Sequence, residues 1–183
     1  MPTIVEELDT AGYGPADIDY VLVTHYDLDH VGGLNRLVPQ FDGPVSVGQA
    51  DLDLLSGQVA PELLHHKGLF HRVSRRLFPL PELPLEPLVD GQRVGGFTAH
   101  HTPGHVVYQH EAASTLFLGN LVWGDADGLT TPFWGDSYDM AQLRRSVAAL
   151  ADRVPTSDVA AMGHGDPLTT GGGEALTDLA RRM

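Results

Sequence analysis

The chain has 183 residues, a length typical of a single domain with a sizeable core, and its 42% apolar content is that of an ordinary globular protein. It contains no cysteine, which excludes disulfides, thiolate zinc sites and a cysteine nucleophile. Its formal net charge of -13 argues against nucleic acid and an anionic membrane as partners, because both require a basic surface. We therefore expect one domain over residues 1–183.

The first predicted element is a helix over residues 3–11, with Ile4, Val5 and Leu8 at helical spacing and Gly12 where a helix should end. The apolar run 20–23 is typical of a buried strand, and Gly32-Gly33 indicates the tight entry to a second helix. The next predicted elements are a short helix over 35–37 stopped by Pro39, a strand over 45–47 and a helix over 49–55.

Residues 62–77 are predicted to form an amphipathic helix. Its approximate apolar stripe consists of Leu63, Leu64, Phe70, Val73 and Leu77, and its other face carries His65, His66, Lys67, His71, Arg72, Arg75 and Arg76. We favour a helix whose charged face is in solvent. The alternative is a lid over a functional site, whose cations contact a carboxylate or a phosphate.

The tract 78–87 is rich in proline and can be neither helix nor central strand, because proline lacks a backbone donor and fixes φ. We interpret it as an extended segment that joins two halves of one domain. Beyond it the pattern predicts strands over 91–94, 97–100, 106–108, 115–118 and 159–162, and helices over 138–150 and 174–182.

Four potential metal ligands, His25, Asp27, Asp29 and His30, lie within six residues directly after the strand 20–23. In open α/β sheets the functional sites lie at the carboxyl ends of strands. Burying two histidines and two aspartates is costly unless a cation holds them. Without cysteine, the ligands must be imidazoles and carboxylates, which suit zinc, iron, manganese or cobalt.

Four motifs in order along the chain resemble those of the metallo-β-lactamase fold hydrolases. The segment from His25 to His30 followed by Gly-Gly resembles the first motif, His-x-His-x-Asp-His. The segments ending in His105, Asn120 and His164 resemble the second histidine motif, the strand end that bears a bridging acid, and the final histidine loop. The resemblance covers nearly the whole chain and implies an α/β fold, the αββα sandwich of that family.

The strands that usually precede the first helix of this family are missing, so we expect the first β layer to be shortened. A shortened layer would expose a sheet edge at which a second copy of the chain can pair as a homodimer. The alternative is that the chain is a fragment of a longer product.

By resemblance, His25, Asp27 and His105 would form a first metal site, and Asp29, His30 and His164 a second. Asp27 stands where the family has a histidine, and Asn120 stands where it has the aspartate that bridges both metals. The number of carboxylates is unchanged but the bridge is lost, since a neutral amide oxygen is a weak ligand. We expect one well-occupied site and a second that is loose or empty. Zinc is the expected metal, one or two ions, with iron or manganese as alternatives.

The activity that this site implies is attack of a metal-bound hydroxide on an ester, lactone, thioester or related carbonyl bond of a small molecule. Asp29 would orient the water or take its proton, besides ligating. Tyr26 and Tyr108 are candidate donors to the developing oxyanion, and simple packing is an equal alternative for each. The aromatic residues Trp123, Phe133, Trp134 and Tyr138 would line an apolar pocket or belong to the core.

The other histidines have plainer interpretations. His101 is expected to support the site by a hydrogen bond, and His110 to be an ordinary surface residue. Two alternatives to the hydrolase remain, namely a catalytically weakened or inactive metal-binding relative, and a mononuclear iron enzyme acting on a sulfur substrate. The chain has no apolar run of membrane-spanning length and no signal-peptide pattern at its start, so we expect a cytoplasmic protein.

Overall fold

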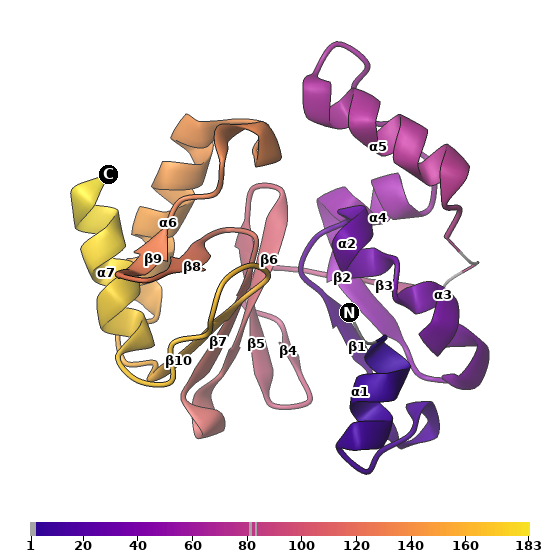
Figure 1. The fold of residues 1–183 in the computed structure, drawn as a ribbon, viewed down its shortest axis with the longest axis horizontal. Helices are drawn as coiled ribbons and strands as arrows, with labels where there is room; N and C mark the ends of the chain where they lie inside the picture. The colour runs from indigo at the N-terminus through magenta and orange to yellow at the C-terminus, as the bar shows by residue number, and fades with distance from the viewer. Residues whose placement is uncertain (1–2, 81, 83) are drawn as a thin grey trace. The chain divides into compact units, whose positions relative to one another are not determined.

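A computed structural model describes residues 3–80, 82 and 84–183 of the protein (Figure 1). The chain divides into two compact units, the first ending at Pro87 and the second beginning at Leu88. Both units combine helices with a β-sheet, as predicted for an α/β protein. Every helix in the described ranges is too short or too polar to cross a bilayer.

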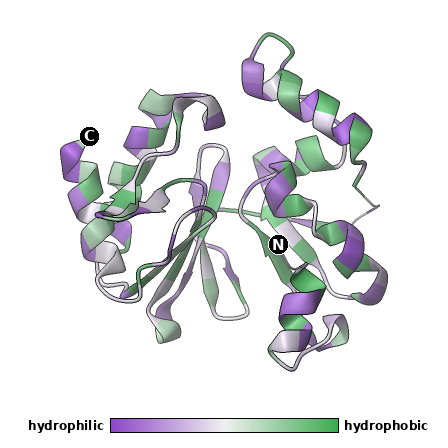
Figure 2. Cartoon of the chain, in the orientation of Figure 1, coloured by the Kyte–Doolittle hydropathy of each residue, from purple (hydrophilic) through white to green (hydrophobic). Residues whose placement is uncertain are grey.

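The first unit contains a three-stranded sheet in the order β1-β2-β3. Its strands are β1 (Val21–Val23), β2 (Val45–Gly48) and β3 (Leu85–Leu88), and its helices are α1 (Ile4–Thr10), η1 (Pro15–Asp17), α2 (Leu28–Val31), α3 (Leu34–Leu37), η2 (Val38–Gln40), α4 (Gln49–Leu55) and α5 (His66–Leu77). Strands β1 and β2 run parallel, with Val21 opposite Val45. Val45 and Val47 are fully buried, because a parallel strand is covered on both faces. Figure 2 accordingly shows hydrophobic colour along these strands.

The helices predicted for this unit are present, but the one predicted over residues 62–77 begins at His66. Local sequence explains where the first helix begins. The N-terminus of α1 carries a capping box, in which the Thr3 hydroxyl accepts from the Glu6 amide and the Glu6 carboxylate accepts from the Thr3 amide. Within the proline tract, Pro81 and Leu83 lie outside the described residues. Its last part forms β3, an edge strand that can include Pro87 because one side of an edge strand needs no ladder donor.

The second unit contains a five-stranded sheet in the order β10-β7-β6-β5-β4 and a separate hairpin, β8-β9. Its elements are β4 (Arg93–Val94), β5 (Phe97–Thr102), β6 (His105–His110), η3 (Glu111–Ala113), β7 (Thr115–Gly119), β8 (Trp123–Asp125), β9 (Gly128–Thr130), η4 (Trp134–Asp136), α6 (Met140–Arg153), β10 (Val159–Met162) and α7 (Gly172–Arg182). Neighbouring strands from β4 to β7 are antiparallel, and β10 joins β7 in parallel.

Helices α6 and α7 cover one face of this sheet and lie side by side (Figure 1). Their buried residues, among them Leu143, Val147 and Leu176, share a core with Leu116 and Leu118 of β7. Asp139 caps α6 by accepting from the amides of Ala141 and Gln142. The hairpin β8-β9 was not predicted, because its strands of three residues are too short to show an alternating pattern.

Candidate metal centre

The loop between β1 and α2 carries the first predicted ligands. Asp27 lies at the N-terminus of α2, where its backbone carbonyl accepts from the amides of His30 and Val31 and so starts the helix. Its carboxylate makes no capping hydrogen bond to the helix. The side chain of Asp27 is therefore available for partners elsewhere in the unit, and the structure shows what they are.

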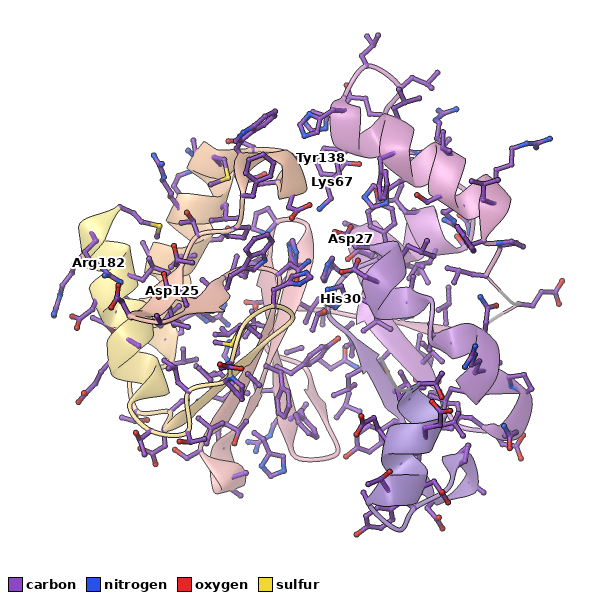
Figure 3. The ribbon with its side chains drawn as sticks, viewed as in Figure 1. Asp27, His30, Lys67, Asp125, Tyr138 and Arg182 are labelled. Carbon is purple, nitrogen blue, oxygen red and sulfur yellow. The ribbon has the colours of Figure 1, made fainter. Side chains whose placement is uncertain are left out.

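The Asp27 carboxylate is buried among three cationic or polar groups of the first unit. The Lys67 ammonium lies 2.8 Å from Oδ2, and the His71 Nε2 lies 3.1 Å from Oδ1. The His25 Nε2 lies 3.4 Å from Oδ2. Figure 3 shows Asp27 and Lys67 together, one on the loop before α2 and the other on α5. Asp27 is thus the counter-ion of a lysine.

These contacts set the ionisation of the group. Burial alone would raise the pKa of Asp27, but hydrogen bonds with His25 and His71 and the charge of Lys67 outweigh burial and hold it far below its ordinary value. Burial also lowers the pKa of His25, although the Asp27 carboxylate opposes that shift. The cluster therefore contains a carboxylate that stays ionised and an imidazole that favours the neutral form.

Lys67 and His71 come from α5, and their burial corrects a prediction. The charged face of this helix was expected to lie in solvent, but Lys67, His71 and Ser74 are buried, whereas Phe70 and Val73 are exposed. On the buried face, Lys67 and His71 contact the Asp27 carboxylate, which supplies the partner that a buried charge requires. The alternative, a lid over the site whose cations contact a carboxylate or a phosphate, stays a prediction, since the carboxylate that Lys67 and His71 contact is that of Asp27.

Sequence reasoning did not include Lys67 and His71 among the site residues, although two signals were available. They are four residues apart and so share one face of a helix. In addition, Lys67 is the only lysine in the chain, beside ten arginines. Lysine presents a compact ammonium where arginine presents a planar fork, so position 67 differs chemically from the arginine positions of the chain.

Asp29 and His30 lie on α2, next to the Asp27 cluster. The His30 Nε2 is 3.4 Å from Asp29 Oδ2, and the rings of His25 and His30 are 4.1 Å apart between centroids. The pKa of Asp29 is lowered, chiefly by its hydrogen bond with His30. His30 is half-buried and Asp29 is exposed, so a cation from solvent can reach both of these potential metal ligands.

The second unit brings its three predicted ligands to one edge of its sheet. Strand β6 begins at His105. Tyr108 of β6 pairs with Phe117 of β7 in an antiparallel register, so His105 lies opposite the end of β7, next to Asn120. Met162 pairs with Gly119, and the Gly163 amide donates to the Gly119 carbonyl, so His164 leaves the sheet at the same edge.

Asn120 supplies the observation that tests whether a cation suits this edge. Its side chain is 4% exposed, and its Oδ1 has no hydrogen-bond partner among the described residues. An unsatisfied buried acceptor costs about 1–3 kcal/mol. An amide oxygen and imidazoles are ligands that divalent metals accept, so these residues fit a metal.

Close backbone packing positions His164. Its carbonyl accepts from the Gly124 amide at 2.9 Å, and its ring lies 4.9 Å from that of Trp123. Gly165 has φ +89°, and a Cβ there would lie 2.2 Å from the Gly124 carbonyl oxygen. Only glycine permits this approach, which brings His164 against the β8 hairpin.

The remaining predicted residues have defined surroundings. Tyr26 is buried with its ring 4.4 Å from that of His71. Tyr108 is buried on β6, three residues from His105, so strand alternation places the two on opposite faces. The His101 amide donates to Asp90, and the His110 ring accepts from the Ala113 amide. Phe133 and Trp134 are exposed, which rules out the core alternative for both.

Comparison with known proteins gives a consistent result. The metallo-beta-lactamase superfamily matches residues 2–164, a range that extends over both units. The chain is 30% identical over 139 residues to the probable metallo-hydrolase YybB of Bacillus subtilis, covering 74% of this chain and 60% of that protein. It is 28% identical over 135 residues to hydroxyacylglutathione hydrolase of Aliivibrio fischeri, covering 74% of this chain and 44% of that protein.

Solved structures give the same fold. TTHA1623 in a di-iron-bound form is 29% identical with a TM-score of 0.68, over 93% of this chain and 80% of that one. The metallo-β-lactamase FIM-1 of Pseudomonas aeruginosa in its mono-zinc form is 16% identical with a TM-score of 0.63, over 95% of this chain and 70% of that one. The predicted resemblance and fold class are confirmed.

Proposed function

Because this chain belongs to the metallo-β-lactamase superfamily, we propose that it is a metal-dependent hydrolase that opens an ester, lactone, thioester or related carbonyl bond of a small molecule. The superfamily binds metal ions, and two similar proteins are named as a probable metallo-hydrolase and a hydroxyacylglutathione hydrolase. The chain spans 60% and 44% of the length of these two proteins.

The single observation that carries the proposal is the buried, unsatisfied Oδ1 of Asn120 at the sheet edge that also bears His105 and His164. Asp29 and His30, the ligands predicted from the first histidine motif, are proposed metal ligands as well. This assignment follows the order of the family's motifs along the chain, and the superfamily match covers each of these residues. Zinc is the proposed metal, and iron and manganese share the same ligand preferences.

A divalent cation in such a site makes a bound water acidic near neutral pH and polarises a substrate carbonyl. Asp29 would orient the attacking water by accepting a hydrogen bond from it, because its lowered pKa keeps the carboxylate ionised beside His30 and its side chain is open to solvent. The same lowered pKa makes Asp29 a weaker base for the proton of that water. Tyr26 and Tyr108 stay predictions as oxyanion donors. The packing of Tyr26 on His71 and the opposite facing of Tyr108 and His105 favour a structural role for both.

The test is metal analysis of protein purified without added metal, combined with hydrolysis of an aryl ester, a lactone and an S-acyl glutathione thioester. We expect bound zinc and turnover of at least one substrate. His30→Ala should abolish both, and His110→Ala, which removes the cap of a surface turn, should leave both unchanged. Bound iron with oxygen consumption on a sulfur substrate would favour the mononuclear iron enzyme. Protein that binds no metal and hydrolyses nothing would be the inactive relative.

Asn120→Asp gives a second test of the assigned ligands. A carboxylate binds a divalent cation more strongly than an amide oxygen does, so the substitution should raise both the metal content of purified protein and its turnover. Asn120→Ser is the matched control, because serine supplies a weak neutral oxygen and should lower both. If Asn120→Asp changes neither quantity, Asn120 is not a ligand.

A further inference from the structure

Lys67 is the only lysine of the chain, and it is buried rather than exposed. Its side chain is 7% exposed, and its ammonium lies 2.8 Å from Asp27 Oδ2. Lysine is almost never buried unless it is paired. Ten other positions of the chain carry arginine, whose planar fork needs more room than a compact ammonium. Lys67 is therefore a paired positive charge buried in the first unit.

The rest of α5 holds Lys67 in place. Gly68 packs so closely on the preceding segment that a Cβ there would lie 1.9 Å from the Glu62 carbonyl oxygen. Near the other end, the Arg75 guanidinium donates to the carbonyls of Leu54 and Leu55 at the C-terminus of α4. Arg72 donates to the Pro61 carbonyl at 2.6 Å. Lys67 thus sits on a helix anchored on both sides, and its ammonium is not that of a mobile surface chain.

The partner of Lys67 occupies a position at which the family resemblance predicts a metal ligand. Both Asp27 oxygens are engaged, Oδ2 by Lys67 and Oδ1 by His71. A divalent ion bound to the same carboxylate would lie within a few ångströms of the ammonium and repel it. The Asp27 carboxylate carries one negative charge, so it can neutralise Lys67 or contribute its charge to a metal ion, but it cannot neutralise both.

We propose that the Lys67 ammonium replaces a metal ion at the His25–Asp27 position, so that Asp27 is the counter-ion of Lys67 and the protein holds a single metal through its other ligands. This inference rests on the proposed function, which supplies that one metal. It assigns Lys67 as a positioning residue: its charge fixes Asp27 and, through it, the His25 and His71 rings. Lys67 thus supplies, from the polypeptide itself, the positive charge that a second metal ion would bring to this position.

Metal stoichiometry tests the inference directly. After dialysis against excess zinc and removal of loosely bound ions, wild-type protein should retain about one zinc per chain by elemental analysis. Asp27→Asn should also retain about one, because Asp27 is not a ligand. Lys67→Met frees the carboxylate and should raise the content to about two, whereas Lys67→Arg keeps the charge and should stay near one.

Two tightly bound zinc ions in the wild type, or loss of the single zinc in Asp27→Asn, would overturn the inference while leaving the proposed hydrolase intact. A folded Lys67→Met protein that still binds one zinc would overturn it as well. Protein that binds no zinc at all would instead overturn the proposed function, and the single-metal assignment with it.

Amine labelling gives a readout that needs no variant, because the chain has one lysine ε-amine. Acetic anhydride should modify Lys67 on the order of tenfold more slowly in the native protein than in urea, with or without zinc, since the pair stays closed. The N-terminal amine provides the internal control, located by mass spectrometry. Labelling of Lys67 that rises when zinc is added would show that metal displaces it from Asp27, which contradicts the inference.

Discussion

Two buried aspartates of the first unit have pKa values shifted in opposite directions. The pKa of Asp27 is far below its ordinary value because, against burial, His25, His71 and Lys67 contact it. Asp51 on α4 is 4% exposed, and burial together with the nearby Asp27 charge raises its pKa to about 7, although Lys67 opposes this. The environment therefore keeps one carboxylate charged and allows the other to be neutral.

This difference predicts a pH-dependent effect of Asp51→Asn. Between about pH 4 and 7 the folded chain keeps a proton on Asp51 that the unfolded chain has released, so the stability from this group is full below about pH 4 and lost as pH rises to about 7. Asparagine mimics the protonated form at every pH. We expect the substitution to raise the free energy of unfolding by less than about 1 kcal/mol at pH 4 and by roughly 2–4 kcal/mol at pH 8.

Urea denaturation of the metal-free protein at the two pH values measures this gain. Asp53→Asn on the same helix, which changes a half-buried carboxylate, is the matched control and should show no such difference. A loss of stability at pH 8 in Asp51→Asn would mean that the Asp51 charge is itself stabilising.

Gly165 is a second residue at which the local environment should determine how much a substitution lowers the free energy of unfolding. Alanine there must adopt φ +89° and would place its Cβ 2.2 Å from the Gly124 carbonyl oxygen, whereas alanine at Gly91 must adopt φ +78° but has open space around it. We expect Gly165→Ala to lower the free energy of unfolding by roughly 1–3 kcal/mol more than Gly91→Ala does. Equal losses in chemical denaturation would show that the two backbones do not approach this closely.

At the scale of elements, α5 shows why hydropathy alone cannot orient a helix. Its buried face carries Lys67, His71 and Ser74, and its exposed face carries Leu69, Phe70 and Val73. Figure 2 shows alternating hydrophilic and hydrophobic bands along it. A face-by-face reading of that pattern would bury the wrong side, because it omits the carboxylate on a distant loop that attracts the cations.

Substitutions on the two faces of α5 should have effects opposite to those expected from hydropathy. Val73 is 52% exposed, so Val73→Gln should change the free energy of unfolding by less than about 0.5 kcal/mol. His71→Ala removes a buried contact of Asp27 and leaves a cavity, so it should cost about 2–4 kcal/mol. If thermal or urea unfolding shows Val73→Gln to be the more damaging of the two, the helix faces the other way.

At the scale of the whole molecule, the proposed ligands are divided between two compact units. His30 belongs to the first unit and His164 to the second, and the superfamily match extends over both. A metal that binds only the folded chain stabilises it by mass action, by about 2.7 kcal/mol at a free zinc concentration roughly 100 times the dissociation constant.

Zinc stabilisation should therefore depend on both units equally. We expect His30→Ala and His164→Ala each to abolish the zinc-induced increase in melting temperature, with His110→Ala as a control that retains it. Differential scanning calorimetry with and without zinc measures this. If only one of the two substitutions removes the effect, the other histidine is not a metal ligand.

Much of the fold followed from local patterns. Hydrophobic runs and their glycine and proline boundaries predicted β1, β2, α4 and most elements of the second unit, because these signals act within a few residues. The positions of His30, His105 and His164 near strand ends were also predictable, since each motif contains its own strand and turn. The hairpin β8-β9 was missed because its stability comes from packing, as buried Leu129 shows, and not from its short strands.

Contacts between distant segments depended on the tertiary structure. The parallel pairing of β7 with β10 joins Gly119 to Met162, and the pairing of Asp27 with Lys67 joins a loop to a helix that begins 39 residues after it. A sequence motif specifies which chemical groups are present near a strand end. Folding alone brings together the groups that could neutralise Asp27. Burial makes an unpaired carboxylate costly, so the cation that neutralises Asp27 depends on the tertiary structure.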